Sequence, residues 1–369
     1  MSGDMNGHAF PHPLARDGGQ GEPLFERIAF VGIGLINGSL ARDVRRLGLA
    51  RSTVATARRR DTVARALALG LVDEATTDAA TAVRGADLVV LGVPVGASGE
   101  AAAALAGGLS PHAVVTDVGS VKARVVELVA PHLDLRRFVP GHPVAGTENS
   151  GPDAAIDGLF DGRWCILTPD ARTDPDAVAR VEALWRAVGA NVERMDPSHH
   201  DKVLAVTSHL PHLLAFNLID TADSIETVLQ REVLKFAAGG FTDVTRIAAS
   251  DPTMWRDVCL HNRDAMLEVL GRYIEDLTAL QRVIRWEEGD ALRERFARAQ
   301  GIRRAVAAAA RVAERRAATP PDGHAADGDG AAGRAPAPQA TPMFTRRRRG
   351  DDAAGAPAVA SAAPPARRA

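Results

Sequence analysis

The hydrophobic and polar positions between residues 25 and 196 follow a repeating order of short apolar runs and amphipathic stretches. Apolar runs bounded by turn residues predict strands, whereas apolar residues that recur every three to four positions predict helices. Strands are expected at 27–33, 53–57, 86–94, 113–120 and 137–146, with helices at 35–49, 60–70, 98–109 and 121–133. This alternation indicates a doubly wound parallel sheet with helices on both faces.

The pattern changes near residue 196. Two further strands at 163–169 and 191–196 flank an amphipathic helix at 176–189, and helical periodicity then continues to about residue 312. We therefore expect an α/β domain over 25–196 and an all-α domain over 197–315. Residues 1–24 and 316–369 lack apolar periodicity, which predicts a disordered leader and a disordered low-complexity tail. The arginine run at 346–349 is interpreted as a solvated patch rather than a nucleic-acid site.

Composition narrows the function classes. The 44 Lys and Arg residues against 46 Asp and Glu residues give a formal net charge of −2, which leaves no overall field to attract nucleic acid or anionic lipid. The chain begins without a signal pattern, and no apolar run approaches the ~18 residues of a membrane span. Cys165 and Cys259 form neither a disulfide framework nor a metal-ligand spacing. A cytoplasmic enzyme or binding protein without nucleic-acid or membrane partners is expected.

A glycine-rich stretch, "FVGIGLINGS" at 30–39, follows the first predicted strand and opens the first helix. At such a place backbone N–H groups and the helix dipole can receive a pyrophosphate. Gly32 is expected to make the tight turn and Gly34 to let the phosphates approach. Asn37 replaces the third glycine of the usual dinucleotide fingerprint, and Gly38 follows it. A tight turn without a ligand is the alternative interpretation.

The end of the second predicted strand bears on the choice of cofactor. Dinucleotide-binding sheets usually carry an acid there that accepts hydrogen bonds from the adenine ribose, but this chain has Ala57 followed by Arg58, Arg59 and Arg60. Arginines suit a 2′-phosphate, so NADP⁺ or acceptance of both NAD⁺ and NADP⁺ is predicted. The alternative is that these arginines only face water. The expected cofactor site is completed by Leu35, Ile36, Val93 and Pro94.

Four later stretches are polar in an apolar context: "TDVGSVK" at 116–122, "GHPVAGTENSG" at 141–151, "SHLPHLLAF" at 208–216 and "FTDVTRIAASDPTMW" at 241–255. The first two follow predicted strands, so Ser120 and His142 are expected at the carboxyl edge of the sheet, beside the glycine turn. His209 and His212 are three apart and share a helix face. Arg246 offers a fixed donor fork that suits a carboxylate.

A hydride-transfer enzyme that oxidises an alcohol needs a base, and an imidazole has the unperturbed pKa for that task. His142 is the candidate base, with Ser120 to orient it or the hydroxyl. For His209 a purely structural role is an equal alternative. A metal site is not predicted, because no carboxylate-rich ligand set accompanies the histidines.

The motifs "VGIGLINGSLA", "DVGSVK", "GHPVAGTENSG", "SHLPHLLAF" and "TRIAASDPTMW", in this order, resemble those of the prephenate and arogenate dehydrogenases of tyrosine biosynthesis. The resemblance extends from residue 31 to residue 255. It implies an N-terminal Rossmann-type domain, a helical C-terminal domain that forms a homodimer, and an active site between them. The implied reaction transfers a hydride from prephenate to the nicotinamide, with loss of CO₂, to give 4-hydroxyphenylpyruvate.

The resemblance also implies roles for single residues. The position of His142 corresponds to the base that accepts the hydroxyl proton, and Ser120 assists it. The guanidinium of Arg246 grips the ring carboxylate, and His209 and His212 lie near the pyruvyl side chain of the substrate. Further substrate-binding positions implied by the resemblance are Lys122, Thr147, Glu148 and Trp255.

Two departures and three alternatives accompany this interpretation. The family usually has glycine where this chain has Asn37, and no regulatory module is recognised in the tail. Arogenate, which carries an amino group in place of the keto oxygen, is the alternative substrate. A non-catalytic nucleotide sensor would not need a base, a serine and a carboxylate clamp together. A methyltransferase would have no use for the helical domain or for "GHPVAG".

Overall fold

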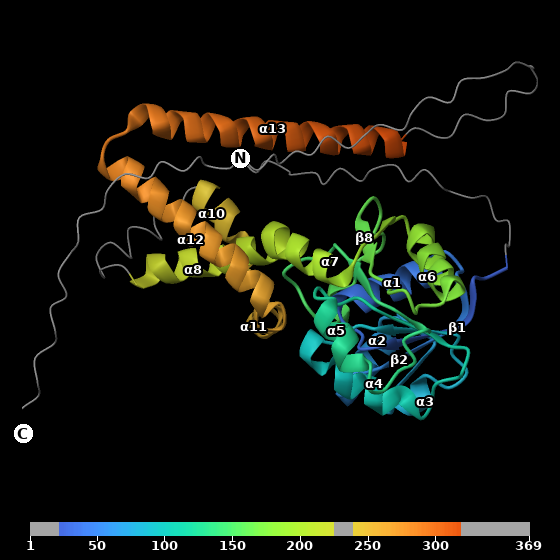
Figure 1. The fold of residues 1–369 in the computed structure, drawn as a ribbon. Helices are drawn as coiled ribbons and strands as arrows, with labels where there is room; N and C mark the ends of the chain where they lie inside the picture. Colours follow the sequence, from blue (N-terminus) through green and yellow to red (C-terminus); the bar gives the residue numbers. More distant parts are fainter. Residues whose placement is uncertain (1–21, 225–238, 319–369) are drawn as a thin grey trace, which may run out of the picture. The chain divides into compact units, whose positions relative to one another are not determined.

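A computed structural model describes residues 22–224 and 239–318, which belong to one compact unit spanning Met1–Pro320 (Figure 1). Most of the predicted leader, most of the predicted tail and the arginine run at 346–349 lie outside the described residues. The boundary near residue 196 between the two expected domains stays a prediction.

A six-stranded parallel sheet, with the order β3-β2-β1-β4-β5-β6, forms the first half of the fold. Its neighbouring strands end level with one another, since Val31 at the end of β1 pairs with both Thr56 of β2 and Leu91 of β4. The chain leaves β1 in one direction across the sheet and returns to the other side of β1 for β4, which makes their carboxyl edge the switch point where dinucleotides bind in such sheets. The strands are β1 (Phe25–Val31), β2 (Ala50–Thr56), β3 (Glu74–Thr76), β4 (Leu88–Leu91), β5 (Val114–Asp117) and β6 (Phe138–Val139).

Helices cover both faces of this sheet because its strands are apolar on both sides. Ile28 and Phe30 of β1 face one buried cluster, and Ala29 and Val31 face the other. The first cluster includes side chains of α1 (Leu35–Arg46), α2 (Arg60–Ala68) and α6 (Pro175–Ala187). The second includes side chains of α3 (Ala79–Ala82), α4 (Ser98–Ala106) and α5 (Ala123–Val129). The predicted Rossmann-type architecture is confirmed.

A second sheet of three strands corrects the prediction that residues 137–146 form one strand of the parallel sheet. Its strands, in the order β7-β8-β9, are β7 (Gly141–Pro143), β8 (Trp164–Leu167) and β9 (Asn191–Arg194), and β7 runs antiparallel to β8. Pro140 separates β6 from β7, because proline has no N–H to donate to a continuing ladder. Its carbonyl accepts from Thr168 N at 2.9 Å instead. His142 therefore lies within β7, just after the parallel sheet ends.

The rest of the described chain is helical, as expected. A π-helical turn, Ala205–His209, interrupts the helical run between α7 and α8. The helices are α7 (Pro197–Leu204), α8 (Leu210–Ser224), α10 (Gly239–Thr245), α11 (Pro252–His261), α12 (Arg263–Arg285) and α13 (Gly289–Ala318). By length and composition alone, the helical run Pro197–Ser224 could cross a membrane, but the core helices of soluble proteins pass the same test.

Candidate active site

The turn after β1 is one that glycine alone fits at its first position. Gly32 has φ 83°, and its N–H donates to Thr56 O at 2.8 Å. A Cβ at Gly32 would lie 2.5 Å from Gly92 O, so a side chain is excluded. A Cβ at Gly34, which caps α1, would meet nothing within 4 Å, and no side chain caps this helix. The turn therefore leaves the N–H groups of α1 open to a phosphate, and it fits a dinucleotide.

Asn37 fills the place of the missing glycine by bonding to its surroundings. Its side chain is buried, and Nδ2 donates to Gly32 O at 2.7 Å and to Val90 O at 3.1 Å. Room for the amide comes from Gly92, where a Cβ would lie 2.4 Å from Nδ2 of Asn37. The side chain thus ties the glycine turn to β4. Behind it, a Cβ at Gly38 would lie 3.0 Å from that of Ala155, so this glycine serves close packing.

The arginines expected near the adenine ribose lie after the end of β2. Ala57 is half-buried, whereas Arg58, Arg59 and Arg60 are exposed. The guanidinium of Arg59 lies 3.5 Å from Asp61, and the side chains of this ion pair are 78% and 88% exposed. Because both partners face water, the pair is weak and Arg59 can exchange it for another anion. Val93 and Pro94 follow β4, the strand next to β1.

His142 takes part in a buried chain of hydrogen bonds. Its Nδ1 lies 2.8 Å from Nε2 of His200, and Nδ1 of His200 lies 2.9 Å from Oδ1 of Asp201. The carboxylate of Asp201 also accepts from the backbone N–H of Lys122 at 2.7 Å and from that of Ala123 at 3.0 Å. The strand β7 therefore presents His142 against two side chains of α7, which are fixed in turn by the start of α5.

The two hydrogen-bonded histidines, His142 and His200, favour the neutral form. Burial lowers the pKa of His142 well below its usual value, and the neighbouring His200, Lys122 and His209 lower it further. Burial also lowers the pKa of His200, which outweighs the opposite effect of its hydrogen bond to Asp201. At neutral pH, His142 can therefore accept a proton.

Lys122 does not reach an open site in this structure. Its side chain is fully buried, and its ammonium group contacts the carboxylate of Asp117 and donates to Gly141 O at 2.6 Å. Asp117 also accepts from Gly141 N at 3.1 Å and from Gly119 N at 2.8 Å. This buried ion pair joins the end of β5 to the residue before His142. It favours a role for Lys122 in holding β7 over the predicted contact with substrate.

The helical part contributes a histidine with one free ring nitrogen. His209 is buried, its Nδ1 lies 3.1 Å from Nδ2 of Asn262, and burial lowers its pKa to about 4. The same amide nitrogen donates to the backbone carbonyl of Asp201 at 2.8 Å. Among the described side chains, Nε2 of His209 and Nε1 of Trp255 are buried without a hydrogen-bond partner. His209 thus presents an unpaired polar group close to the His142 chain.

The other predicted substrate residues form two contacts. His212 stacks on Trp255 with ring centroids 3.7 Å apart, and His209 meets the same indole edge-on at 6.1 Å. The guanidinium of Arg246, in the turn Arg246–Ala249, lies 3.7 Å from the carboxylate of Glu148, and the Arg246 side chain is 65% exposed. Predicted substrate residues that lie far apart in the sequence therefore contact each other in pairs.

Ser120 and Thr147 lie on loops that follow β5 and β7. Ser120 is half-buried, and Oγ1 of Thr147 accepts from Asn149 N at 3.3 Å. The second loop passes the glycine turn, because a Cβ at Gly146 would lie 3.8 Å from Leu35 and 4.0 Å from Ile36. The loop with Thr147 and Glu148 therefore adjoins the start of α1.

Three site residues were missed from the sequence: His200, Asp201 and Asn262. A signal was present for the first two, since "PSHHDKVL" places His200 four positions before Leu204, on the face of α7 that is buried. Titratable residues on an apolar helix face need partners. Asn262 gave no such signal, because it precedes α12 in a polar stretch.

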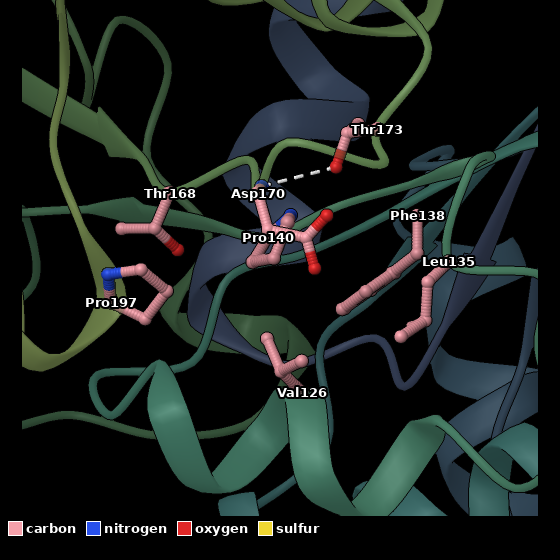
Figure 2. A pocket seen from close by; sticks show the side chains of 8 residues that line it. All are labelled: Val126, Leu135, Phe138, Pro140, Thr168, Asp170, Thr173 and Pro197. Atoms are coloured by element: carbon pink, nitrogen blue, oxygen red, sulfur yellow. Dashed lines mark hydrogen bonds between the residues drawn. The ribbon is translucent and has the colours of Figure 1, made fainter.

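Figure 2 shows a pocket apart from these residues. The side chain of Thr168 is buried at its wall without a hydrogen-bond partner in the described chain, and Asp170 N donates to Thr173 Oγ1 at 3.2 Å. No predicted site residue lines the pocket. Its lining is Val126, Leu135, Phe138, Pro140, Thr168, Asp170, Thr173 and Pro197. Over residues 22–224 and 239–318, no group of three or more His, Cys, Asp or Glu side chains could hold a metal ion.

Two models of known protein domains match consecutive parts of this chain. The family model described as prephenate dehydrogenase, nucleotide-binding domain, matches residues 40–194, and the one described as prephenate dehydrogenase, dimerization domain, matches residues 196–298. The chain is 42% identical over 284 residues to the cyclohexadienyl dehydrogenase of Zymomonas mobilis, which covers 77% of this chain and 97% of the relative.

Two solved structures are similar to about three quarters of this chain. The prephenate dehydrogenase from A. aeolicus in complex with hydroxyphenyl propionate and NAD⁺ matches with a TM-score of 0.72 and 36% identity, covering 76% of this chain and 98% of that one. The arogenate dehydrogenase of Synechocystis matches with a TM-score of 0.65 and 30% identity, and the match covers 76% of this chain and 99% of that one.

Proposed function

The chain belongs to the prephenate dehydrogenase family, and on that premise we propose that it catalyses the oxidative decarboxylation of prephenate to 4-hydroxyphenylpyruvate in tyrosine biosynthesis. The observation that carries the proposal is the position of His142. It follows the carboxyl edge of the parallel sheet, is neutral at neutral pH, and is fixed through Nδ1, so that Nε2 is left to accept a proton.

The residues divide the reaction between them. His142 accepts the proton of the substrate hydroxyl while a hydride leaves the ring carbon that bears this hydroxyl. The ring carboxylate then departs as CO₂, which leaves an aromatic ring. When bound, the nicotinamide supplies the hydride acceptor. The guanidinium of Arg246 binds the ring carboxylate in place of its solvent-exposed contact with Glu148. Ser120 orients the hydroxyl or the base.

His209 binds the substrate through its unpaired nitrogen. Because Nδ1 of the neutral ring accepts from Asn262, its proton is on Nε2, which is buried and unpaired. Such a donor suits a carboxylate or keto oxygen of the pyruvyl group, since binding would supply the partner that it lacks. His212 and Trp255 form the apolar wall beside it. Thr147 and Glu148 approach from the loop next to the glycine turn.

The cofactor site favours acceptance of both NAD⁺ and NADP⁺. The glycine turn holds the pyrophosphate with the contribution of Leu35 and Ile36, and Gly38 packs behind it against Ala155. Val93 and Pro94 line the side toward β4. No carboxylate follows β2 at Ala57 to discriminate against a 2′-phosphate. The exposed Arg58 and Arg59 supply positive charge for that group.

We propose that the chain forms a homodimer through its helical part. We also propose that the protein is located in the cytoplasm. The match to a dimerization domain supports the dimer. So does an exposed apolar stripe on α12 with heptad spacing, formed by Leu267, Ile274, Leu277 and Ile284. Sedimentation equilibrium should give twice the chain mass of 38.8 kDa; the mass of a single chain at micromolar concentration would contradict the dimer.

Arogenate is the second candidate substrate, favoured by the likeness to the Synechocystis enzyme. The deciding experiment offers prephenate and arogenate in turn with NAD⁺ and with NADP⁺ and follows the absorbance of the reduced nicotinamide. We expect turnover of prephenate with both cofactors. Turnover of arogenate alone would exchange the substrate, and no turnover with any of the four pairs would refute the proposed function.

A further inference from the structure

The histidine assigned as the base is the first member of a buried series of three side chains. His142, His200 and Asp201 are 8%, 0% and 5% exposed. The two contacts that join them, at 2.8 Å and 2.9 Å, connect ring nitrogens and a carboxylate oxygen in one direction, from β7 to α7. The rings of His142 and His200 meet edge to face, with an interplanar angle of 68°.

The order of these contacts determines where the protons lie. Carboxylate oxygens only accept, and each oxygen of Asp201 already accepts one backbone N–H group, so Nδ1 of His200 must carry the proton between the ring and Oδ1. Nε2 of the neutral His200 is then an acceptor, and Nδ1 of His142 must donate to it. The lone pair of the neutral His142 is left on Nε2.

The opposite arrangement would leave two acceptors facing each other. If His200 carried its proton on Nε2, its Nδ1 lone pair would oppose the Asp201 oxygen at 2.9 Å. Both groups are buried, where an unmade hydrogen bond costs about 1–3 kcal/mol. That cost selects one tautomer by roughly fivefold to 10²-fold.

We propose that His200 and Asp201 are positioning residues that hold His142 with its proton on Nδ1 and its lone pair on Nε2, and that stabilise the charge that His142 gains from the substrate hydroxyl. The inference rests on the proposed role of His142 as base. As Nε2 takes the hydroxyl proton, the Nδ1 proton shifts toward Nε2 of His200, and the Nδ1 proton of His200 shifts toward Asp201. Each proton moves along an existing hydrogen bond, and all return when the phenol oxygen is protonated.

Other charged and titratable groups around the two rings do not replace this pair. Lys122 and Asp117 neutralise each other at the start of β7, and Nδ1 of His209 is hydrogen-bonded to Asn262. Among the described residues, Asp201 is therefore the acid that bonds directly to the histidine pair.

The test reads tautomers by NMR in the full-length protein with ¹⁵N-labelled histidine rings. His142 is assigned by comparing wild type with His142→Asn. We expect the wild-type His142 and His200 to carry their protons on Nδ1 near neutral pH, which the ring nitrogen shifts and couplings distinguish. A proton on Nε2 of His142 would overturn the proposal. This measurement needs no turnover, so it stands apart from any failure of the proposed function.

The kinetic arm uses two variants with matched controls. His200→Gln and Asp201→Asn replace a group that can only accept at this place by an amide that can either donate or accept, and kcat should fall by about 10²-fold because the base loses its fixed orientation. KM for prephenate should stay within about threefold, since neither side chain binds the substrate. His199→Gln and Asp196→Asn make the same exchanges at exposed positions of the same helix region, and both should keep the wild-type kcat.

The variants also separate positioning from a merely structural role. In His200→Gln the His142 ring should lose its single tautomer, and kcat should fall. A variant whose kcat stays within threefold of wild type would overturn the proposal. A loss of kcat with an unchanged His142 tautomer, or with a parallel rise in KM, would also overturn it, because a structural defect alone then explains the loss.

Discussion

Replacing Lys122 by methionine removes a cation from the interior and leaves its partners in place. Lys122 is fully buried, and its ammonium group joins the Asp117 carboxylate at the end of β5 to the carbonyl of Gly141 in β7. Methionine fills nearly the same volume, so little cavity forms. The substitution therefore isolates the loss of the ammonium group.

The expected cost follows from the charge that is left behind. Removing one partner of a buried ion pair destabilises a protein by about 3–5 kcal/mol, because the other charge remains buried and unpaired. Asp117 keeps two backbone N–H donors, from Gly119 and Gly141, which favours the lower half of that range. The corresponding drop in Tm is roughly 5–7 °C, from an unfolding entropy of about 2.1 cal/mol/K for each described residue. Since Gly141 precedes the base, kcat should fall by roughly 10-fold to 10²-fold as well.

Calorimetry and steady-state kinetics measure the two effects. Lys202→Met is the matched control, because Lys202 is exposed on α7, and its Tm and kcat should stay close to wild type. Adding Asp117→Asn to Lys122→Met should restore part of the lost stability, since the uncompensated charge is removed. An unchanged Tm with a raised KM for prephenate would refute the reasoning and return Lys122 to the substrate-binding role expected from the family resemblance.

Three further substitutions test the cofactor and substrate halves. Asn37→Ala breaks both hydrogen bonds from the side chain to the backbone and should lower the free energy of unfolding by roughly 2 kcal/mol and weaken NAD⁺ binding in calorimetric titrations; equal NAD⁺ affinity would mean that the turn holds its shape without the amide. Ala57→Asp should lower the ratio of kcat/KM with NADP⁺ to that with NAD⁺, because a carboxylate repels the 2′-phosphate. An unaltered ratio would show that residue 57 does not meet the ribose. Arg246→Ala should raise KM for prephenate by about 10-fold or more, against no change for the exposed Arg263→Ala, and a normal KM would move the carboxylate clamp elsewhere.

The regular parts of the fold were predictable because the spacing of apolar residues determines them. The strand β4 is apolar along its whole length and β1 is apolar from Ile28 to Val31, and the helices between them carry one apolar face. The predicted ends of the helices were less accurate. The helix α1 ends at Arg46 rather than at residue 49, because Gly48 adopts φ 64°, which is outside the helical range. β3 and α3, with three and four residues, are too short for periodicity to reveal.

The second sheet was not predictable from local pattern. The sequence around Pro140 is as apolar as a continuing strand, and only the partner of each segment distinguishes one strand from two. β7 pairs with β8, more than 20 residues further along the chain, and such long-range pairing leaves no local mark.

The candidate site also has residues that could be predicted from the sequence and residues that could not. Residues with unusual chemistry in an apolar context, such as His142 and His209, were found from the sequence. Their partners His200 and Asn262 were not, because a hydrogen bond between distant segments depends on the fold. Lys122 was named from the family resemblance, but its contact with Asp117 became visible only in three dimensions.

The most direct measurement of the central claim compares wild type with His142→Asn for turnover of prephenate and for binding of the substrate. The wild type should reduce NAD⁺ in the presence of prephenate, and the variant should lose about 10²-fold or more in kcat while its affinity for prephenate stays within a few-fold. Asparagine keeps a polar side chain at this position but offers no basic nitrogen. A variant with the wild-type kcat would contradict the account, because His142 would then have no part in removing the hydroxyl proton.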